Sequence, residues 1–232
     1  MWVDDLCELS AYWPDLADFW PSDDKLVDWY LETNANLVRE LTAAPADLEC
    51  RTFLPAPSPL EMWARRQAHE TAVHRFDAEH AEHAGGRFDP AFAADGIDEM
   101  LLAFAPRGST FAIDGPATMV VHATDTDDRW HVTLTPNGIT TVAGDGPSDV
   151  TLTGKASDLY LTVWNRHDDS TIEVTGNRDL LNTWHQGHRI RWSAGVAGER
   201  ESASSGQLHH RTSYLDRSDN TTTAAGTTRR HR

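Results

Sequence analysis

Lysine, cysteine and long apolar runs are all scarce in this sequence, and each shortage excludes a class of protein. The 232 residues carry 36 acidic against 20 basic side chains, and lysine occurs only at positions 25 and 155. A formal charge of −16 argues against nucleic acid or an anionic membrane surface as a partner, because both need a basic patch. Neither is therefore expected as a partner.

The cysteines and the apolar segments point to the compartment. Two cysteines, Cys7 and Cys50, are too few for a disulfide framework or a cysteine zinc site, and they favour a reducing environment. No apolar run approaches the roughly 18 to 20 residues that span a bilayer, and the acidic opening MWVDDLCELS is unlike a signal peptide. We therefore expect a cytoplasmic protein with no membrane partner.

Apolar material for a core is plentiful. Hydrophobic residues make up 39% of the chain and include nine tryptophans, so a folded protein is expected. The length allows one large domain or two small ones. Trp29, Trp63 and Trp164 are predicted to lie in the core.

Helical periodicity prevails over the first hundred residues. Residues 1–20 favour one or two short helices, and Ser22 or Asp23 is a suitable N-cap for a longer one. Ser58-Pro59 starts another, because proline is tolerated in the first turn. The longer predicted helices are residues 24–43, 59–82 and 90–104.

The pattern changes to short strands separated by turn signals after residue 118. The predicted strands are 119–124, 130–135, 139–142, 150–153 and 171–174, with helices over 157–165 and 177–188. Helices followed by an antiparallel sheet with helices predict the fold class α then α+β. Residues 193–232 have almost no apolar side chains, which predicts a disordered tail. The predicted domains are therefore 1–105 and 106–192, followed by the tail 193–232.

A carboxylate and an imidazole stand one helical turn apart in the helix predicted at 59–82. Glu70 and His74 leave the same face, so they could share one metal ion if a third ligand came from elsewhere. The alternative is a hydrogen-bonded carboxylate–histidine pair at the edge of a bundle. Glu79 and His83 have the same spacing but are predicted to face solvent.

Four stretches of the chain resemble one enzyme family. They are WARRQAHETAVHRFDAE from Trp63 to Glu79, DPAFAADGIDEMLLAF, HATDTDDRWHVTLTPNG and GKASDLYLTVWNR. Together they are similar to the mycothiol-dependent maleylpyruvate isomerase family of actinobacteria, in order over residues 25 to 192. The resemblance implies a DinB-like helical bundle followed by a small α+β domain resembling sterol carrier protein (SCP2-like).

The resemblance also implies a metal site. Family members hold a divalent metal, usually zinc, with a histidine from an early helix and with the Glu and His of E-x-x-x-H, which match Glu70 and His74. No histidine precedes His69, and the helices that should open the bundle are absent or reduced to residues 1–20. We expect either that residues are missing before Met1 or that the chain is a degenerate member. Asp4, Asp5 or Glu8 could replace the histidine.

The chemistry implied is the activation of a thiol. A metal with an open position would bind mycothiol as a thiolate, for a cis–trans isomerisation or a thiol transfer on a small-molecule substrate. Arg66 is a candidate for holding the mycothiol or a substrate carboxylate, and its alternative role is that of a surface helix arginine. No catalytic residue can be assigned.

Two functions from different classes follow. One is a metal- and mycothiol-dependent isomerase or transferase, whose activity requires a third ligand. The other is a non-catalytic homologue that serves as a binding or dimerisation module. A bundle short of two helices would expose the apolar faces of the helices at 24–43 and 59–82, and such patches usually find a partner, here a second copy of the chain.

Overall fold

The computed structural model describes residues 21–81, 85–166 and 169–188. The short helices predicted within residues 1–20 and the disordered tail predicted for 193–232 lie outside this part of the chain. Among the described helices, none combines the length and the apolar character needed to cross a membrane.

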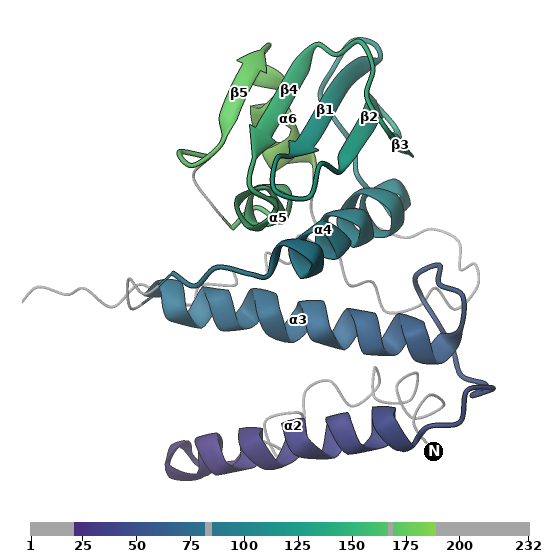
Figure 1. Ribbon diagram of the computed structural model, residues 1–232, viewed down its shortest axis with the longest axis vertical. Helices are drawn as coiled ribbons and strands as arrows, with labels where there is room; N and C mark the ends of the chain where they lie inside the picture. The colour runs from purple at the N-terminus through teal and green to yellow at the C-terminus, as the bar shows by residue number, and fades with distance from the viewer. Residues whose placement is uncertain (1–20, 82–84, 167–168, 189–232) are drawn as a thin grey trace, which may run out of the picture. The chain divides into compact units, whose positions relative to one another are not determined.

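Helices make up the first half of the described chain, as predicted (Figure 1). Asp89 caps one of them, since its side chain accepts hydrogen bonds from the backbone N–H groups of Ala91 and Phe92. Ser58, predicted to start the next long helix, also caps it, because Ser58 Oγ accepts a hydrogen bond from Glu61 N at 3.2 Å. The elements are η2 (Asp23–Lys25), α2 (Leu26–Ala43), α3 (Pro59–Ala81), α4 (Pro90–Asp98), the π-helix η3 (Glu99–Phe104) and η4 (Ala105–Arg107).

The second half is a five-stranded sheet with two helices. The strands are β1 (Ala117–Ala123), β2 (Arg129–Thr135), β3 (Gly138–Ala143), β4 (Val150–Gly154) and β5 (Glu173–Gly176), and the helices are α5 (Ala156–Val163) and α6 (Asp179–Gly187). The order across the sheet is β3-β2-β1-β4-β5. The α then α+β fold class is thus confirmed.

The sheet is mixed, and the prediction of a wholly antiparallel sheet was wrong. β4 does not pair with β3, which precedes it, but crosses to the free edge of β1 and runs parallel to it, with Val121 opposite Leu152. The other three pairings are antiparallel. Alternating apolar residues fix which face of a strand is buried, but they do not identify its neighbour.

One apolar core runs from α3 through α4 to the sheet. It includes Val73 on α3, Ile97 on α4, Leu152 on β4 and Trp184 on α6, all at most 2% exposed. α4 lies between α3 and the layer formed by α5 and the sheet (Figure 1). The core is therefore continuous across the boundary predicted at residue 105.

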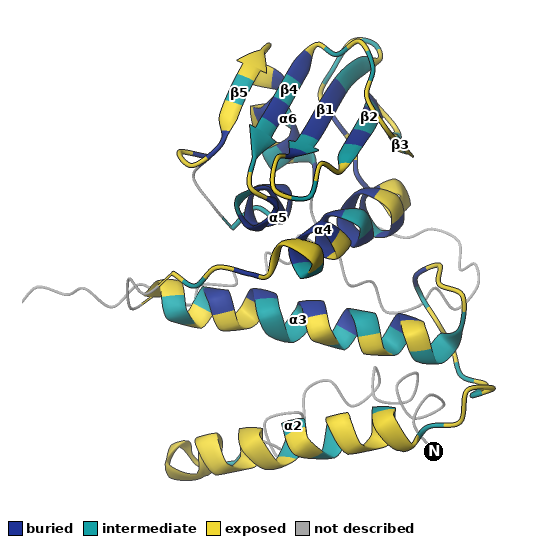
Figure 2. Ribbon diagram, viewed as in Figure 1, coloured by how far each residue is buried: buried dark blue, intermediate teal, exposed yellow. Residues whose placement is uncertain are grey.

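Helix α2 contributes nothing to this core. None of its residues is buried, and Trp29 is 43% exposed, so the core position predicted for that tryptophan was wrong. Figure 2 shows α2 almost wholly in the exposed colour, whereas α3 has a buried stripe. The exposed large apolar side chains of α2 are Leu26, Val27, Trp29, Tyr30, Leu31 and Val38. The apolar exposure predicted for this helix is confirmed. The same exposure predicted for the helix at 59–82 was wrong, because the apolar residues Met62, Val73 and Phe76 of α3 are buried.

Candidate functional site

Polar side chains occupy the middle of the buried stripe of α3. Residues at spacings of three and four share one side of a helix, and here they are Met62, Arg66, His69, Val73 and Phe76. Arg66 is 2% and His69 is 1% exposed. Two polar groups so deeply buried need partners, because an unpaired one would cost several kcal/mol (roughly 2–7).

Arg66 is paired on both sides and stacked. Its Nη1 bonds the carboxylate of Glu99, at the start of the π-helix, and its Nη2 lies 3.0 Å from Glu70 Oε2. The guanidinium carbon lies 5.0 Å from the ring centroids of both Phe104 and Trp164, within reach of cation–π attraction. The alternative of a surface arginine was therefore wrong.

Glu99 is the buried counter-charge of this arginine. Only 1% of the residue is exposed, and burial raises the pKa of its carboxyl group above the ordinary value, while Arg66 opposes the rise. A buried ion pair of this kind fixes geometry more than it adds stability, since desolvation of both charges offsets their attraction.

His69 bridges α3 to α4 and α5. Its Nε2 lies 2.7 Å from Asp95 Oδ2, and its Nδ1 lies 3.1 Å from the hydroxyl of Tyr160. Arg65 donates to the same Asp95 oxygen at 2.9 Å. The hydrogen bond from His69 is the main cause that holds the pKa of Asp95 below its usual value, and burial raises the pKa of Tyr160.

The predicted pair lies a quarter turn from this buried stripe, where α3 is partly open. Glu70 Oε1 and His74 Nε2 are 3.0 Å apart, and the two side chains are 38% and 60% exposed. His74 Nδ1 lies 3.1 Å from Asp77 Oδ2, and Asp77 Oδ1 forms an ion pair with Arg166 Nε at 2.8 Å. Both ring nitrogens of His74 thus face a carboxylate oxygen.

These residues supply two donors for a cation and not three. In the described ranges no group of three or more His, Cys, Asp or Glu side chains is arranged to hold a metal ion. Asp77 cannot be the third, because it contacts the opposite nitrogen of the ring from Glu70. The other candidates, Asp4, Asp5 and Glu8, lie outside the described residues, and so does His83.

Three polar residues of the second half of the chain have structural partners. His122 Nε2 accepts from Arg129 Nη2 at 2.9 Å, and His131 Nε2 lies 3.0 Å from the carbonyl oxygen of Pro147. Asp125 Oδ1 accepts from Ala156 N at 2.8 Å and so caps α5. None of the three joins the group around Glu70.

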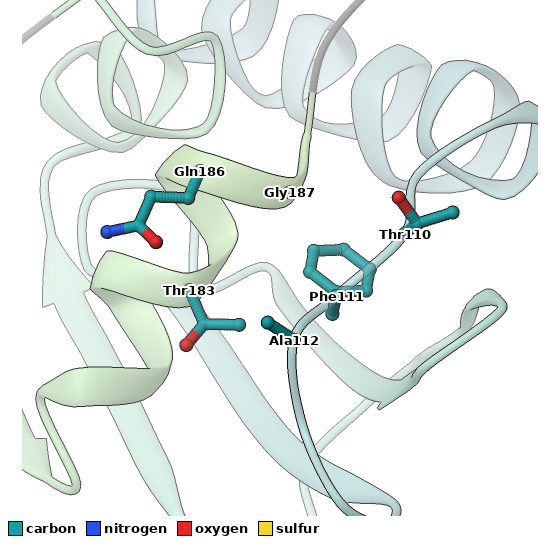
Figure 3. A pocket seen from close by; sticks show the side chains of 6 residues that line it. All are labelled: Thr110, Phe111, Ala112, Thr183, Gln186 and Gly187. Carbon is teal, nitrogen blue, oxygen red and sulfur yellow. The ribbon is translucent and has the colours of Figure 1, made fainter.

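A pocket that the sequence did not predict lies between the chain at 110–112 and α6 (Figure 3). It measures about 330 Å³, and its lining residues are Thr110, Phe111, Ala112, Thr183, Gln186 and Gly187. None of these side chains carries a charge or a strong nucleophile. The pocket therefore offers no chemistry of its own, and it shares no residue with the group around Glu70.

The sequence also missed the partners of the α3 residues. Asp95, Glu99 and Tyr160 contact α3 from positions 26, 33 and 91 residues away in the chain. Asp77 alone carried a local signal, since it stands three residues after His74 on the same helix.

The chain has two parts. The helical half carries the carboxylate–histidine pair, and a half built on a mixed sheet with helices follows it. Two family models match these parts in the same order. The model described as mycothiol maleylpyruvate isomerase N-terminal domain matches residues 19–79, and the MDMPI C-terminal domain matches residues 91–183. The chain belongs to the mycothiol maleylpyruvate isomerase family.

Solved structures show only distant similarity, and no curated protein matches. The stereoselective inverting sec-alkylsulfatase Pisa1 from Pseudomonas sp. is 17% identical with a TM-score of 0.30, over 34% of this chain and 14% of its own. The UbiJ-SCP2 ubiquinone synthesis protein is 16% identical with a TM-score of 0.29, over 41% of this chain and 92% of its own. A possible sterol carrier protein from Thermus thermophilus is 12% identical with a TM-score of 0.24, over 47% and 94%. The chain thus spans only a small part of the alkylsulfatase.

Proposed function

We propose that this chain is a mycothiol-dependent metalloenzyme of the isomerase or thiol-transferase type, in which Glu70 and His74 supply two of the metal donors. The observation that carries the proposal is the convergence of Glu70 Oε1 and His74 Nε2, 3.0 Å apart on a partly open face of α3. Family membership supports the thiol partner, mycothiol, and a small-molecule substrate.

The donor types suit a borderline cation such as zinc, which takes imidazole nitrogen and carboxylate oxygen readily. When bound with a position free, such a cation lowers the pKa of a coordinated thiol, so that it acts as a thiolate. In this proposal the third protein donor comes from outside the described residues. Glu70 and His74 bind and orient, and their partial exposure leaves room for a ligand.

Arg66 is less suited to hold a substrate carboxylate. Its guanidinium is 2% exposed and is already shared between Glu99 and Glu70. A substrate would have to displace one of these two carboxylates. The contacts instead support a role for Arg66 in holding Glu70.

Zinc content of the full chain tests the proposal. The wild type should bind one zinc ion per chain, by elemental analysis after dialysis, and Glu70→Gln and His74→Asn should each lose it. Glu79→Gln is the matched control, because Glu79 lies on the same helix and pairs with Arg75 at 3.4 Å. A wild type that binds no zinc, or a Glu70→Gln variant that keeps its zinc, would refute the proposal.

A second candidate function rests on a different observation, the exposed apolar side chains of α2. In this alternative the chain is a non-catalytic module that dimerises through α2 with a second copy. Val38→Glu, at a position 56% exposed, should then convert a dimer to a monomer in sedimentation velocity. Arg39→Glu is the control, because its side chain is 65% exposed and, at 100° per residue, it lies on the side of α2 away from all six exposed apolar side chains. A wild type that is monomeric at high concentration would exclude this alternative.

A further inference from the structure

The surroundings of His74 divide its two ring nitrogens between two carboxylates. Nε2 faces Glu70 Oε1 at 3.0 Å, and Nδ1 faces Asp77 Oδ2 at 3.1 Å. All three residues lie on α3 within two turns, so their spacing is set by the helix itself. A neutral imidazole has only one N–H, so the two carboxylates compete for it.

We infer that Asp77 is a positioning residue for His74, held in place by Arg166. By accepting the Nδ1–H of the ring, Asp77 would leave the lone pair of Nε2 directed toward Glu70. A histidine that binds a metal usually donates its other N–H to a carboxylate or carbonyl in this way, which fixes the ring and raises its basicity. The inference rests on the proposed function, and it adds the residues that orient one of its ligands.

Arg166 makes the arrangement more than a local helix contact. It follows α5, in the other half of the chain, and forms an ion pair in which its Nε lies 2.8 Å from Asp77 Oδ1. Its Nη1 also donates to the carbonyl oxygen of Trp164 at 3.0 Å, which restricts the guanidinium. The carboxylate of Asp77 therefore has one oxygen on Arg166 and the other on His74.

Glu70 is restrained from the opposite side by the same kind of contact. Its Oε2 lies 3.0 Å from Arg66 Nη2, which leaves Oε1 as the oxygen that faces His74. Each of the two proposed ligands thus has one atom engaged with a neighbour and one atom directed at the other ligand.

Exposure separates this role from a structural one. The side chains of Asp77 and Arg166 are 36% and 33% exposed, and ion pairs at such exposed positions contribute little to stability. Asp77→Asn should therefore leave the urea midpoint nearly unchanged while altering the ring of His74. Substitution of a residue that only stabilised the fold would lower the urea midpoint and leave the ring of His74 unaltered.

The test has two readouts, of which the first needs no metal. In metal-free full chain labelled with ¹⁵N-histidine, at a pH where the ring is neutral, Asp77→Asn should shift His74 toward the Nε2–H tautomer. Arg166→Gln should shift it less, in the same direction, and Glu79→Gln should not shift it. Unchanged ¹⁵N signals of His74 in Asp77→Asn would overturn the inference whether or not the protein binds zinc.

The second readout is zinc affinity, measured by competition with a chromophoric chelator. Loss of such a carboxylate should weaken zinc binding by roughly 10–100-fold, with Glu79→Gln unchanged. Equal affinity in Asp77→Asn and wild type would overturn the positioning role. If the wild type binds no zinc, the proposed function fails, and the tautomer measurement still decides whether Asp77 orients His74.

Discussion

Replacing Arg66 with methionine would leave the carboxylate of Glu99 buried without its cation. Both side chains are 2% exposed, so neither can reach water without a rearrangement of α3 or of η3. Methionine keeps much of the volume between Phe104 and Trp164 but loses the charge that stacks on both rings. The variant therefore tests electrostatics more than packing.

The expected cost is large for a single substitution. Breaking one side of a buried ion pair typically destabilises a protein by about 3–5 kcal/mol, because the remaining charge has lost its partner. Native domains are stable by only about 5–15 kcal/mol, so Arg66→Met should remove roughly a fifth or more of the total. The loss of two cation–π contacts acts in the same direction.

The pH dependence of that cost has a definite sign. In Arg66→Met the folded-state pKa of Glu99 should rise further above its unfolded value, because desolvation is then unopposed. A carboxyl whose pKa is raised on folding binds its proton more tightly in the folded state. Its contribution favours folding below the unfolded pKa and is lost as the pH rises through the folded pKa. The variant should accordingly be closest to wild type in acid and furthest from it near neutral pH.

The assay is urea denaturation followed by tryptophan fluorescence. A second variant distinguishes the loss of the ion pair from the loss of side-chain packing. The double variant Arg66→Met/Glu99→Met should be more stable than Arg66→Met alone, since it leaves no buried charge. Arg75→Met is the control, because Arg75 is 54% exposed and its ion pair with Glu79 should be worth less than about 1 kcal/mol. An Arg66→Met variant that loses less than about 1 kcal/mol, or a double variant less stable than the single one, would refute the reasoning.

Two further predictions concern packing and protonation. A Cβ at Gly96 would lie 2.2 Å from the ring of Tyr160, whereas one at Gly108 would meet nothing within 4 Å. Gly96→Ala should therefore lower the free energy of unfolding by about 1–3 kcal/mol or more, and Gly108→Ala by much less. Thermal melts of both variants measure the difference. Burial lowers the pKa of His188 from 6.5 to about 4. Its contribution to stability is therefore present above the pKa of the unfolded state and is lost as the pH falls toward the pKa of the folded state. Wild type should lose about 2 kcal/mol more than His188→Gln between about pH 7 and about pH 5 in urea titrations, and parallel profiles would contradict this.

The elements of the fold were largely predictable, because each depends on a local pattern. The helix predicted at 59–82 is found as Pro59–Ala81, and the strand predicted at 130–135 is found as Arg129–Thr135. The last strand, predicted at 171–174, is found two residues later as Glu173–Gly176. The crossover of β4 to β1 was missed because strand pairing is set by contacts far apart in the chain.

The polar residues of α3 show where a pattern in the sequence stops being informative. The helical spacing correctly placed Glu70 and His74 on one face of α3, but it did not show that Arg66 and His69 lie on the buried face of that helix. Apolar periodicity identifies a buried face only when that face is apolar, and here its middle is charged or polar. The missing information was the identity of the opposing groups, Glu99 and Tyr160, which come from other elements.

The same helix therefore has two adjoining faces with different requirements. On the buried face, Arg66 and His69 are bound by Glu99, Asp95 and Tyr160, and these contacts restrict the rotation of α3 against the rest of the chain. Residues that hold a ligand must keep their geometry to within about 0.5 Å, which a helix fixed on one side by paired polar groups can do. If the proposed site is correct, substitutions on the buried face should weaken metal binding in proportion to the loosening of α3. This holds even though Arg66, through its ion pair with Glu70, is the one residue named on that face that contacts a proposed metal-binding side chain.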